Sequence, residues 1–355
     1  MRKVTGIGIM SGTSLDGMDI ALCEFTEPAV ASSKDWGYTI LRAETYSYEE
    51  EWRQRLENAH LTDAASCWKL HVDFGHYTGQ RINSFLAGST TRVDFIASHG
   101  HTVFHQPHNG FTCQIGDGAA IAAATGIKTV CDFRSTDVAH GGQGAPLVPI
   151  GDQLLFGNYQ SCLNIGGIAN ISFNENGQRI AFDVCPANMV FNFLAKQAQQ
   201  AYDKNGEMAR SGTIDPSLLH QLNELRYYQQ ADKKSIGREW VEEKFMQVLS
   251  RLNLSVATKM ATVVEHCAQQ IAAVINKNKL NNVLLSGGGA YHRFLVERIG
   301  AHSKAELIIP DNKTIEFKEA LVFAFLGLLR LDEKINCLRT VTGADKNSIG
   351  GAVYL

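Results

Sequence analysis

The chain has 355 residues, 45% of them hydrophobic, with 32 glycines and 7 prolines. This length allows two domains of ordinary size, and the composition predicts folded units with many tight turns. The net charge of −3 and the lack of a long apolar segment exclude a strongly basic nucleic-acid binder and a membrane-spanning protein. Eight scattered cysteines without a C-x-x-C pair indicate free thiols in a reducing cytoplasm.

The first part of the chain predicts three strands, then a helix, a strand, a helix and a strand. VTGIGIM, IALCEF and YTILRAETYSY have the patterns of strands, and the polar turn IMSGTSLDGMD at 9–19 joins the first two. A helical region at 66–88, the strand VDFIASHG, the helix AAIAAATG and the strand KTVCDF follow.

The second part repeats this order, from the strands SCLNIGG, ANISFN and RIAFDV to the strand AELIIP. The repeat predicts two α/β units, each a mixed sheet with helices on its faces. We expect a first unit at 1–131 and a second at 132–337, with a charged helical insertion at about 203–257. The segment of about 338–355 is expected to pack back on the first unit, and the glycines and prolines of 132–151 suit the join.

Three glycine-containing turns lie at strand ends. IMSGTSLDG and NIGGIANIS each join the first two strands of a unit, and LLSGGGAYH lies between a strand and a helix. Each alone is also explained as an ordinary turn. Together, the first two predict contacts with the phosphates of one nucleotide, and the third predicts contact with its adenosine end. The residues assigned to the nucleotide are Gly12, Thr13, Ser14, Leu15, Asp16, Gly17, Met18, Asp19, Asn164, Gly166, Gly167, Gly287, Gly288 and Gly289.

The first turn also carries two carboxylates, Asp16 and Asp19. Mg²⁺ keeps most of its water shell and takes one or two carboxylates, so either residue suits it, directly or through water. An edge-strand charge is the alternative explanation for Asp19.

Longer motifs run over almost the whole chain: GIMSGTSLDGMD, SHGHTVFHQP, QIGDGAAIA, DFRSTDVAHGGQGAPLVP, NIGGIANIS, FDVCPANMVFN and LLSGGGAYH. They resemble the motifs of the anhydro-N-acetylmuramic acid kinases, within the actin–hexokinase–Hsp70 superfamily. The resemblance implies an α/β fold of two duplicated ribonuclease-H-like units. Each would be a mixed five-stranded sheet with helices, and the two would face each other across a nucleotide cleft.

Members of this family phosphorylate 1,6-anhydro-N-acetylmuramic acid with ATP and open its anhydro ring with water. The resemblance therefore implies a cytoplasmic, dimeric kinase that uses ATP and Mg²⁺ and makes N-acetylmuramic acid 6-phosphate in peptidoglycan recycling. One departure is visible. Where the family pattern reads FD-T-G-P-G/A-N, this chain has Val184 and Cys185 as the third and fourth residues.

The resemblance makes Asp183, at the end of RIAFDV, the catalytic aspartate, a general base that takes a proton from water. A strand-end cap is the alternative explanation. Asn188 of the same motif is assigned to the substrate.

Arg134 and Glu319 are also assigned to the sugar substrate. The guanidinium of Arg134 suits the lactyl carboxylate, but a structural bridge to Asp132 or Asp137 explains it equally well. The resemblance puts Glu319 in the sugar pocket, although a glutamate in the first turn of KEALVFAFLGLL also complements the helix dipole.

Four histidines, His99, His101, His105 and His108, lie close together in the sequence. His101 and His105 have the i, i+4 spacing of metal ligands on a helix, but the strand end and the proline of VDFIASHGHTVFHQP argue against a helix and against a metal site. We expect His99 and His101 to line the pocket and to hydrogen-bond the sugar hydroxyls.

Two other functions remain open at this point. A metal-dependent carbamoyltransferase of the same superfamily would hold iron through an H-x-x-x-H pair. An actin- or Hsp70-like ATPase would turn over ATP whether or not the sugar is present.

Overall fold

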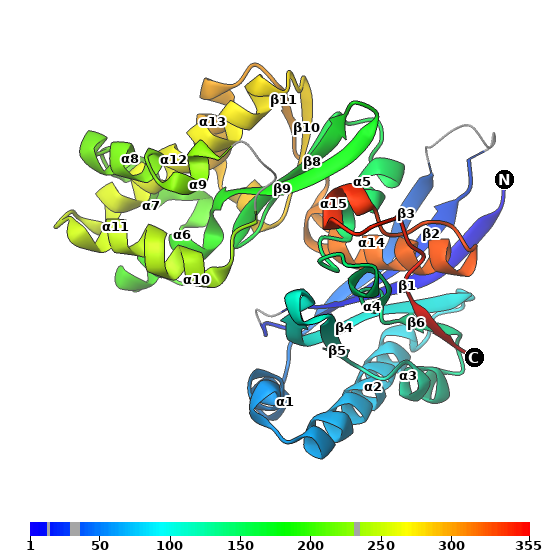
Figure 1. The fold of residues 1–355 in the computed structure, drawn as a ribbon. Helices are drawn as coiled ribbons and strands as arrows, with labels where there is room; N and C mark the ends of the chain where they lie inside the picture. Colours follow the sequence, from blue (N-terminus) through cyan, green and yellow to red (C-terminus); the bar gives the residue numbers. More distant parts are fainter. Residues whose placement is uncertain (13–14, 29–35, 231–234) are drawn as a thin grey trace. The chain divides into compact units, whose positions relative to one another are not determined.

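The computed structural model describes residues 1–12, 15–28, 36–230 and 235–355, which form two compact units (Figure 1). The first unit contains Met1–Gly157 and Phe317–Leu355, and the second contains Asn158–Glu316. The predicted division after residue 131 therefore lies too early, and residues 317–337 belong to the first unit rather than the second. The physical reason is a buried C-terminal helix that packs on the first sheet.

The first unit is built on a seven-stranded mixed sheet in the order β12-β6-β4-β1-β2-β3, with β5 paired to β4. Its strands are β1 (Lys3–Ser11), β2 (Met18–Thr26), β3 (Gly37–Tyr46), β4 (Phe95–Gln106), β5 (Phe111–Ile115), β6 (Thr129–Cys131) and β12 (Ala352–Tyr354). Five strands were predicted, and this count was wrong. The strand β4 continues to Gln106 and turns back through the left-handed Gly110 into β5, and β12 adds to β6 in antiparallel orientation.

The helices of this unit are α1 (Glu50–Glu57), α2 (Ala64–Leu86), α3 (Gly118–Thr125), α4 (Ser135–Ala139), α5 (Val148–Leu155), α15 (Arg339–Thr342) and most of α14 (Asn312–Leu331). The GIGI run of β1 explains how two layers pack on one strand. Ile7 and Ile9 join the core that α2 covers. On the other face, a Cβ on Gly8 would lie 1.8 Å from the carbonyl oxygen of Ala320, so glycine allows α14 to lie directly against the strand.

The second unit has a five-stranded mixed sheet in the order β11-β10-β7-β8-β9. Its strands are β7 (Ser161–Ile165), β8 (Ile168–Glu175), β9 (Gln178–Pro186), β10 (Asn282–Ser286) and β11 (Glu306–Ile308). Its helices are α6 (Asn188–Gln197), α7 (Glu207–Ser211), α8 (Pro216–Asn223), α9 (Arg226–Gln229), α10 (Arg238–Trp240), α11 (Met246–Arg251), α12 (Val256–Lys277) and α13 (Arg293–His302).

The predicted insertion at 203–257 is helical and supplies α7 to α11. It is less solvated than its charge suggested, because Leu218, Leu222 and Phe245 are fully buried in the core of the second unit. The long helix α12 lies between this layer and the sheet, in contact with α7, α8 and β9. The insertion is therefore an additional helical layer of this unit.

The strand orders β6-β4-β1-β2-β3 and β11-β10-β7-β8-β9 are the same when read along the chain. In each unit the first three strands are antiparallel and the next two are added in parallel. This confirms the internal repeat and the mixed α/β fold. Among the described residues, we find no helix with the length and apolar character needed to cross a membrane.

Candidate active site

The turn between β1 and β2 carries the first predicted phosphate site. Leu15 has the left-handed φ of 58° and its N–H bonds back to the carbonyl of Gly12 at 3.4 Å. Gly17 is buried, and a Cβ there would lie 2.8 Å from the carbonyl oxygen of Tyr46. The side chain of Met18 is buried in the core, so only its backbone is free for a ligand. Thr13 and Ser14 lie outside the described residues.

A buried chain of hydrogen bonds fixes the start of this turn. The Tyr48 hydroxyl donates to Ser11 Oγ at 2.7 Å, so the hydroxyl of Ser11 donates in turn to Nδ1 of His101 at 3.2 Å. Burial lowers the pKa of His101 to about 4, which keeps the imidazole neutral and able to accept. The histidine predicted to bind sugar hydroxyls thus has a hydrogen bond within the protein instead. Sequence reasoning missed Ser11 and Tyr48.

The two carboxylates of the turn differ in exposure. Asp16 is exposed, whereas Asp19 is half-buried in β2 and accepts a hydrogen bond from Thr45 Oγ1 at 2.6 Å. Carboxylate oxygens at a solvent-accessible turn fit Mg²⁺, which retains several waters. In the described part of the chain, no cluster of three or more His, Cys, Asp or Glu side chains could hold a metal on its own.

In the second unit, the predicted second turn, the Asn188 region and the SGGG loop come together. The backbone N–H of Asn188 donates to the carbonyl of Gly166 at 3.1 Å, and that of Ala187 donates to the carbonyl of Gly167 at 2.9 Å. The side-chain amide of Asn188 donates to the carbonyl of Ile165 at 3.1 Å. The start of α6 therefore holds the turn 165–167 through the three carbonyl groups of the turn.

The glycines of these loops divide into two kinds. A Cβ on Gly289 would lie 2.1 Å from Ile165 Cγ2, and one on Gly287, whose φ is 75°, would lie 2.5 Å from Asn164 Oδ1. Packing therefore requires both. By contrast, a Cβ on Gly166, Gly167 or Gly288 would meet nothing closer than 3.5 Å. Close approach of a ligand explains these three glycines better than packing does.

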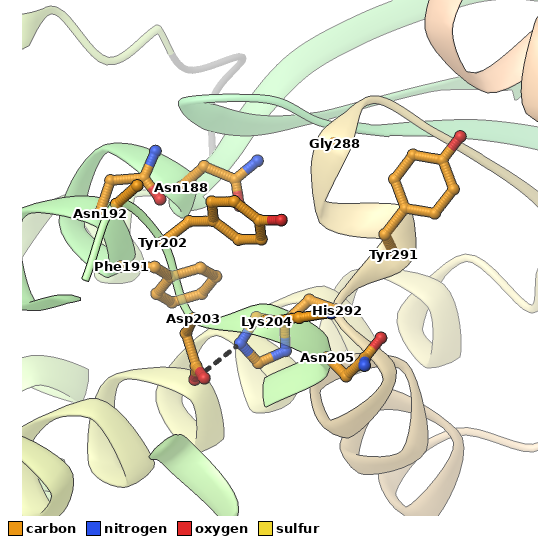
Figure 2. A pocket seen from close by; sticks show the side chains of 11 residues that line it. Asn188, Phe191, Asn192, Tyr202, Asp203, Lys204, Asn205, Gly288, Tyr291 and His292 are labelled. Carbon is orange, nitrogen blue, oxygen red and sulfur yellow. Dashed lines mark ion pairs between the residues drawn. The ribbon is translucent and has the colours of Figure 1, made fainter. Parts of the chain in front are cut away.

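A pocket of about 450 Å³ lies beside Gly288 and Asn188 (Figure 2). The rings of Tyr202 and Tyr291 line it, and both are partly exposed. Both an aromatic lining and this volume are typical of small-molecule sites. The phenol of Tyr291 donates to Glu316 at 3.0 Å. This pocket lies where the sequence predicted the adenosine end of a nucleotide.

A buried pair forms the floor of this pocket. His292 Nδ1 accepts the N–H of Leu295 at 3.1 Å, which assigns the ring proton to Nε2. Nε2 lies 3.4 Å from Asp203 Oδ2 (Figure 2). Asp203 also accepts the N–H groups of Met208 and Ala209, so it ties the start of α7 to the start of α13. Neither residue was singled out in the sequence.

Asp183 lies within β9, three residues before the strand ends, rather than at a strand-end cap. Opposite it, the register shifts, because Asn170 pairs with Asp183 and Ala169 with Cys185. Val184 is therefore a β-bulge residue. Val184 and Cys185, the departure from the family pattern, are both buried in the core. The altered residues thus point into the unit and pack there.

The carboxylate of Asp183 is held by hydrogen bonds from one segment. Its Oδ2 accepts the N–H of Ile236 at 2.8 Å and the hydroxyl of Ser235 at 3.4 Å. Burial raises the pKa of Asp183, and these two donors oppose that rise. Among the described residues, no Lys, Arg or His forms an ion pair with it. A desolvated carboxylate without a cation is the usual state of a general base.

Arg134 is bound on two sides within the first unit. Its Nε and Nη2 donate to His99 Nε2 at 3.0 and 2.8 Å, and its Nη1 donates to the carbonyl of Gly144 at 2.6 Å. His99 Nδ1 lies 2.8 Å from the Gly100 carbonyl and donates to it, so both ring nitrogens are occupied and the ring is neutral. His99 therefore supports Arg134 rather than offering a free donor to a sugar. The alternative bridge to Asp132 or Asp137 is wrong for the described structure.

Glu319 lies in α14 next to this arginine. Its side chain is accessible to solvent, but the surrounding protein raises its pKa by desolvation, and the positive charge of Arg134 opposes the rise. Asp19 adds a further upward effect on the pKa. Burial lowers the pKa of Arg134 to about 10, and Glu319 opposes that effect most strongly. Glu319, Arg134, His99 and Asp19 thus form one polar group in the first unit.

The histidine spacing does not indicate a metal. The strand β4 contains both His101 and His105, so the i, i+4 spacing is not helical. His105 Nδ1 lies 3.0 Å from Thr112 Oγ1 in the neighbouring strand β5. His101 and His105 thus each have a hydrogen-bond partner within the first unit.

The comparisons with known proteins agree with the sequence motifs. The family model "Anhydro-N-acetylmuramic acid kinase" matches residues 4–355. The chain is 36% identical over 375 residues to the anhydro-N-acetylmuramic acid kinase of Sulfurovum sp. (strain NBC37-1), with 100% of both chains covered. It is 36% identical over 372 residues to that of Vibrio cholerae serotype O1, with 98% of this chain and 97% of the relative covered.

Solved structures give more distant matches. An activator of 2-hydroxyisocaproyl-CoA dehydratase from Clostridium difficile, with bound ADPNP, aligns with a TM-score of 0.46 at 12% identity and covers 93% of this chain and 96% of its own. ROK hexokinase from Thermus thermophilus aligns with a TM-score of 0.38 at 10% identity, and the alignment covers 92% of this chain and 99% of the hexokinase chain. The fold assignment therefore rests on the strand order and the repeat.

Proposed function

The chain belongs to the anhydro-N-acetylmuramic acid kinase family, and we propose that it opens 1,6-anhydro-N-acetylmuramic acid with water while transferring a phosphoryl group from ATP to O6. The observation that carries the proposal is the environment of Asp183, a desolvated carboxylate that accepts hydrogen bonds and forms no ion pair with a described Lys, Arg or His. The carbamoyltransferase and the actin- or Hsp70-like ATPase are not favoured, because the family match covers residues 4–355.

In the proposed reaction, the carboxylate of Asp183 is the proton acceptor. Asp183 takes a proton from a water molecule, whose oxygen bonds to the anomeric carbon. The bond between that carbon and O6 breaks, and O6 forms its new bond to the γ-phosphorus of ATP. The bond from the γ-phosphorus to the bridging oxygen breaks, and ADP leaves. Ring opening supplies the nucleophile for phosphoryl transfer, so the two events are coupled.

ATP is assigned to the glycine turns and the neighbouring pocket. The space around Gly166 and Gly167 allows phosphate oxygens to approach their backbone, and the pocket beside Gly288 suits the adenosine end. Asp16 and Asp19 would hold Mg²⁺ through water, and the ion would supply charge stabilisation to the phosphoryl group.

The polar group of the first unit is assigned to the sugar. Arg134 is kept in place by His99 and Gly144, so its charge suits the lactyl carboxylate of the substrate. Glu319 is solvent-accessible and suits a sugar hydroxyl. The same proposal includes a cytoplasmic location, a homodimeric state and a role in peptidoglycan recycling. These three points rest on the family resemblance.

The position of an isotope label tests the proposal. The reaction is run in ¹⁸O-water with ATP and anhydro-N-acetylmuramic acid, and the product is analysed by mass spectrometry. We expect one ¹⁸O atom in the anomeric hydroxyl and none in the phosphoryl group. Label in the phosphoryl group would contradict the proposed roles of water and O6.

A further inference from the structure

We propose that the helical insertion positions the catalytic base, with Tyr227, Ser235 and Ile236 acting as positioning residues for Asp183. This inference rests on the proposed role of Asp183 in the reaction. It gives a function to a segment that the strand repeat does not need, since the five-strand motif of the first unit forms without it.

The insertion contacts both the backbone and the side chain of Asp183. The Tyr227 hydroxyl donates to the main-chain carbonyl of Asp183 at 2.6 Å. Eight and nine residues later, the Ser235 hydroxyl and the Ile236 N–H donate to Oδ2. Described residues of the insertion thus contact Asp183 at two separate points, its main-chain carbonyl and its carboxylate.

The β-bulge explains why the backbone contact is needed. The extra residue Val184 interrupts the regular pairing of β9 with β8 directly after Asp183. A carbonyl in an interrupted ladder requires another donor when it is buried. Tyr227 of α9, which is buried in the core of the second unit, supplies that donor and fixes the peptide plane from which the carboxylate projects.

The described hydrogen bonds to the Asp183 side chain contact only one of its two carboxylate oxygens. Both hydrogen bonds go to Oδ2, and within the described residues no donor contacts Oδ1. Oδ1 is therefore the atom that accepts the proton from water. Both donors also stabilise the ionised form, against the effect of burial on the pKa.

Asp183 lines a cavity of about 270 Å³. The other polar side chains of this cavity are those of Glu175, Tyr228, Gln230, Gln270, Lys277 and Asn278. Tyr227 contributes its hydroxyl from α9. The hydroxyl of Tyr228 is buried and has no hydrogen-bond partner in the described part of the chain. Tyr228→Phe is therefore a matched control, because it removes a neighbouring buried hydroxyl that holds nothing.

The experiment compares Tyr227→Phe, Tyr228→Phe and Asp183→Asn in one coupled assay of ADP formation with the anhydro-sugar. We expect Tyr227→Phe to lower kcat about tenfold with the KM for ATP unchanged, since a small misplacement of a catalytic group is costly. Tyr228→Phe should stay within about twofold of the parent enzyme. Equal behaviour of the two tyrosine variants would overturn the inference.

The pH profile provides a readout that a merely structural role would not change. Ile236→Pro removes the N–H that bonds Oδ2, so the pKa of Asp183 rises further and the acidic limb of kcat should move to higher pH. An unmoved limb in folded Ile236→Pro would overturn the inference, and Tyr227→Phe decides it if this variant does not fold. An active Asp183→Asn variant would instead contradict the proposed function. If Asp183→Asn loses activity while Tyr227→Phe has the kcat of the parent enzyme, the positioning role of Tyr227 is contradicted and the proposed function is not.

Discussion

The two units carry a carboxylate at the same place in their repeat. Glu44 of β3 pairs opposite Ile20, the third residue of β2, and Asp183 of β9 pairs opposite Asn170, the third residue of β8. Glu44 forms an ion pair with Arg42 at 3.1 Å, with 43% of its side chain exposed. Asp183 is enclosed and its pKa is raised by burial. The same position thus holds an exposed ion pair in one unit and a desolvated carboxylate in the other.

The strands that hold these carboxylates also differ in where they bulge. In β3 the extra residue is Leu41, which is exposed in the middle of the strand. In β9 it is Val184, which is buried and adjoins Asp183. Only the second bulge directly follows the carboxylate at this position. The strand order is therefore shared by the two units, whereas the bulge next to Asp183 and the helical insertion belong to the second unit alone.

Among the variants that test this difference between the units, we expect the largest loss of activity from a change at Arg134, in the first unit. Arg134→Lys removes the fork that bonds His99 and Gly144 at once. The guanidinium would then no longer be held toward the lactyl carboxylate, and loss of that charged hydrogen bond should lower kcat/KM for the anhydro-sugar by about 10- to 100-fold. Steady-state kinetics with varied sugar and saturating ATP measure this. A parent-like value would remove Arg134 from the substrate site.

Substitution of two glycines in the second unit distinguishes a glycine needed for packing from one needed for ligand binding. Gly289→Ala places a methyl 2.1 Å from Ile165 and should destabilise the unit by about 1–3 kcal/mol. Gly288→Ala meets only the amide of Asn188 at 3.5 Å, so its Tm should stay close to that of the parent while ATP binds several-fold more weakly. Thermal melts and ATP titrations of the pair test this. Unchanged ATP affinity in Gly288→Ala would contradict the nucleotide site.

Acid should destabilise the first unit through His101. Burial lowers the pKa of His101 to about 4, whereas an unfolded histidine has a pKa near ~6.5. The unfolded chain therefore binds more protons between these values, and stability falls as pH decreases through this window. The loss is on the order of a few kcal/mol. Urea melts from pH 7 to 4 measure it, and His101→Gln should flatten the dependence. An equally steep dependence in that variant would assign the effect to other groups.

The smallest effect is expected at Glu44, the counterpart of Asp183. Glu44→Gln removes one exposed ion pair and should change stability by less than ~1 kcal/mol. Its turnover should equal that of the parent enzyme. A loss of activity would break the comparison, because it would give the two carboxylates related roles.

Much of the fold could be predicted from the sequence, because strand alternation and the order of elements repeat along the chain. The sequence did not reveal β5 and β12 as sheet strands. A His- and Gln-rich extension of β4 gives no strand pattern, and AVY is too short to distinguish from a loop. The division of the units was also misplaced, since the approach of α14 to Gly8 depends on tertiary packing.

The site was predictable where chemistry resides in a local motif. Asp183, Asn188 and the glycine turns stand in short characteristic segments, and the structure gathers Asn164, Gly166, Asn188 and Gly287 in one place. The contact of Tyr227 with Asp183 spans 44 residues and has no sequence signal. The contact of His99 with Arg134 likewise has no sequence signal, because the two residues lie 35 positions apart.

The central claim is that Asp183 is the base that couples ring opening to phosphoryl transfer. Asp183→Asn keeps the shape of the side chain and removes the base. The most direct test measures ring-opened sugar and ADP in the same reaction mixture, with ATP binding determined separately. The account predicts that both products fall together by ~10²-fold or more while ATP binding is retained. ADP formation that continues without ring opening, or a variant with near-normal turnover, would contradict the account.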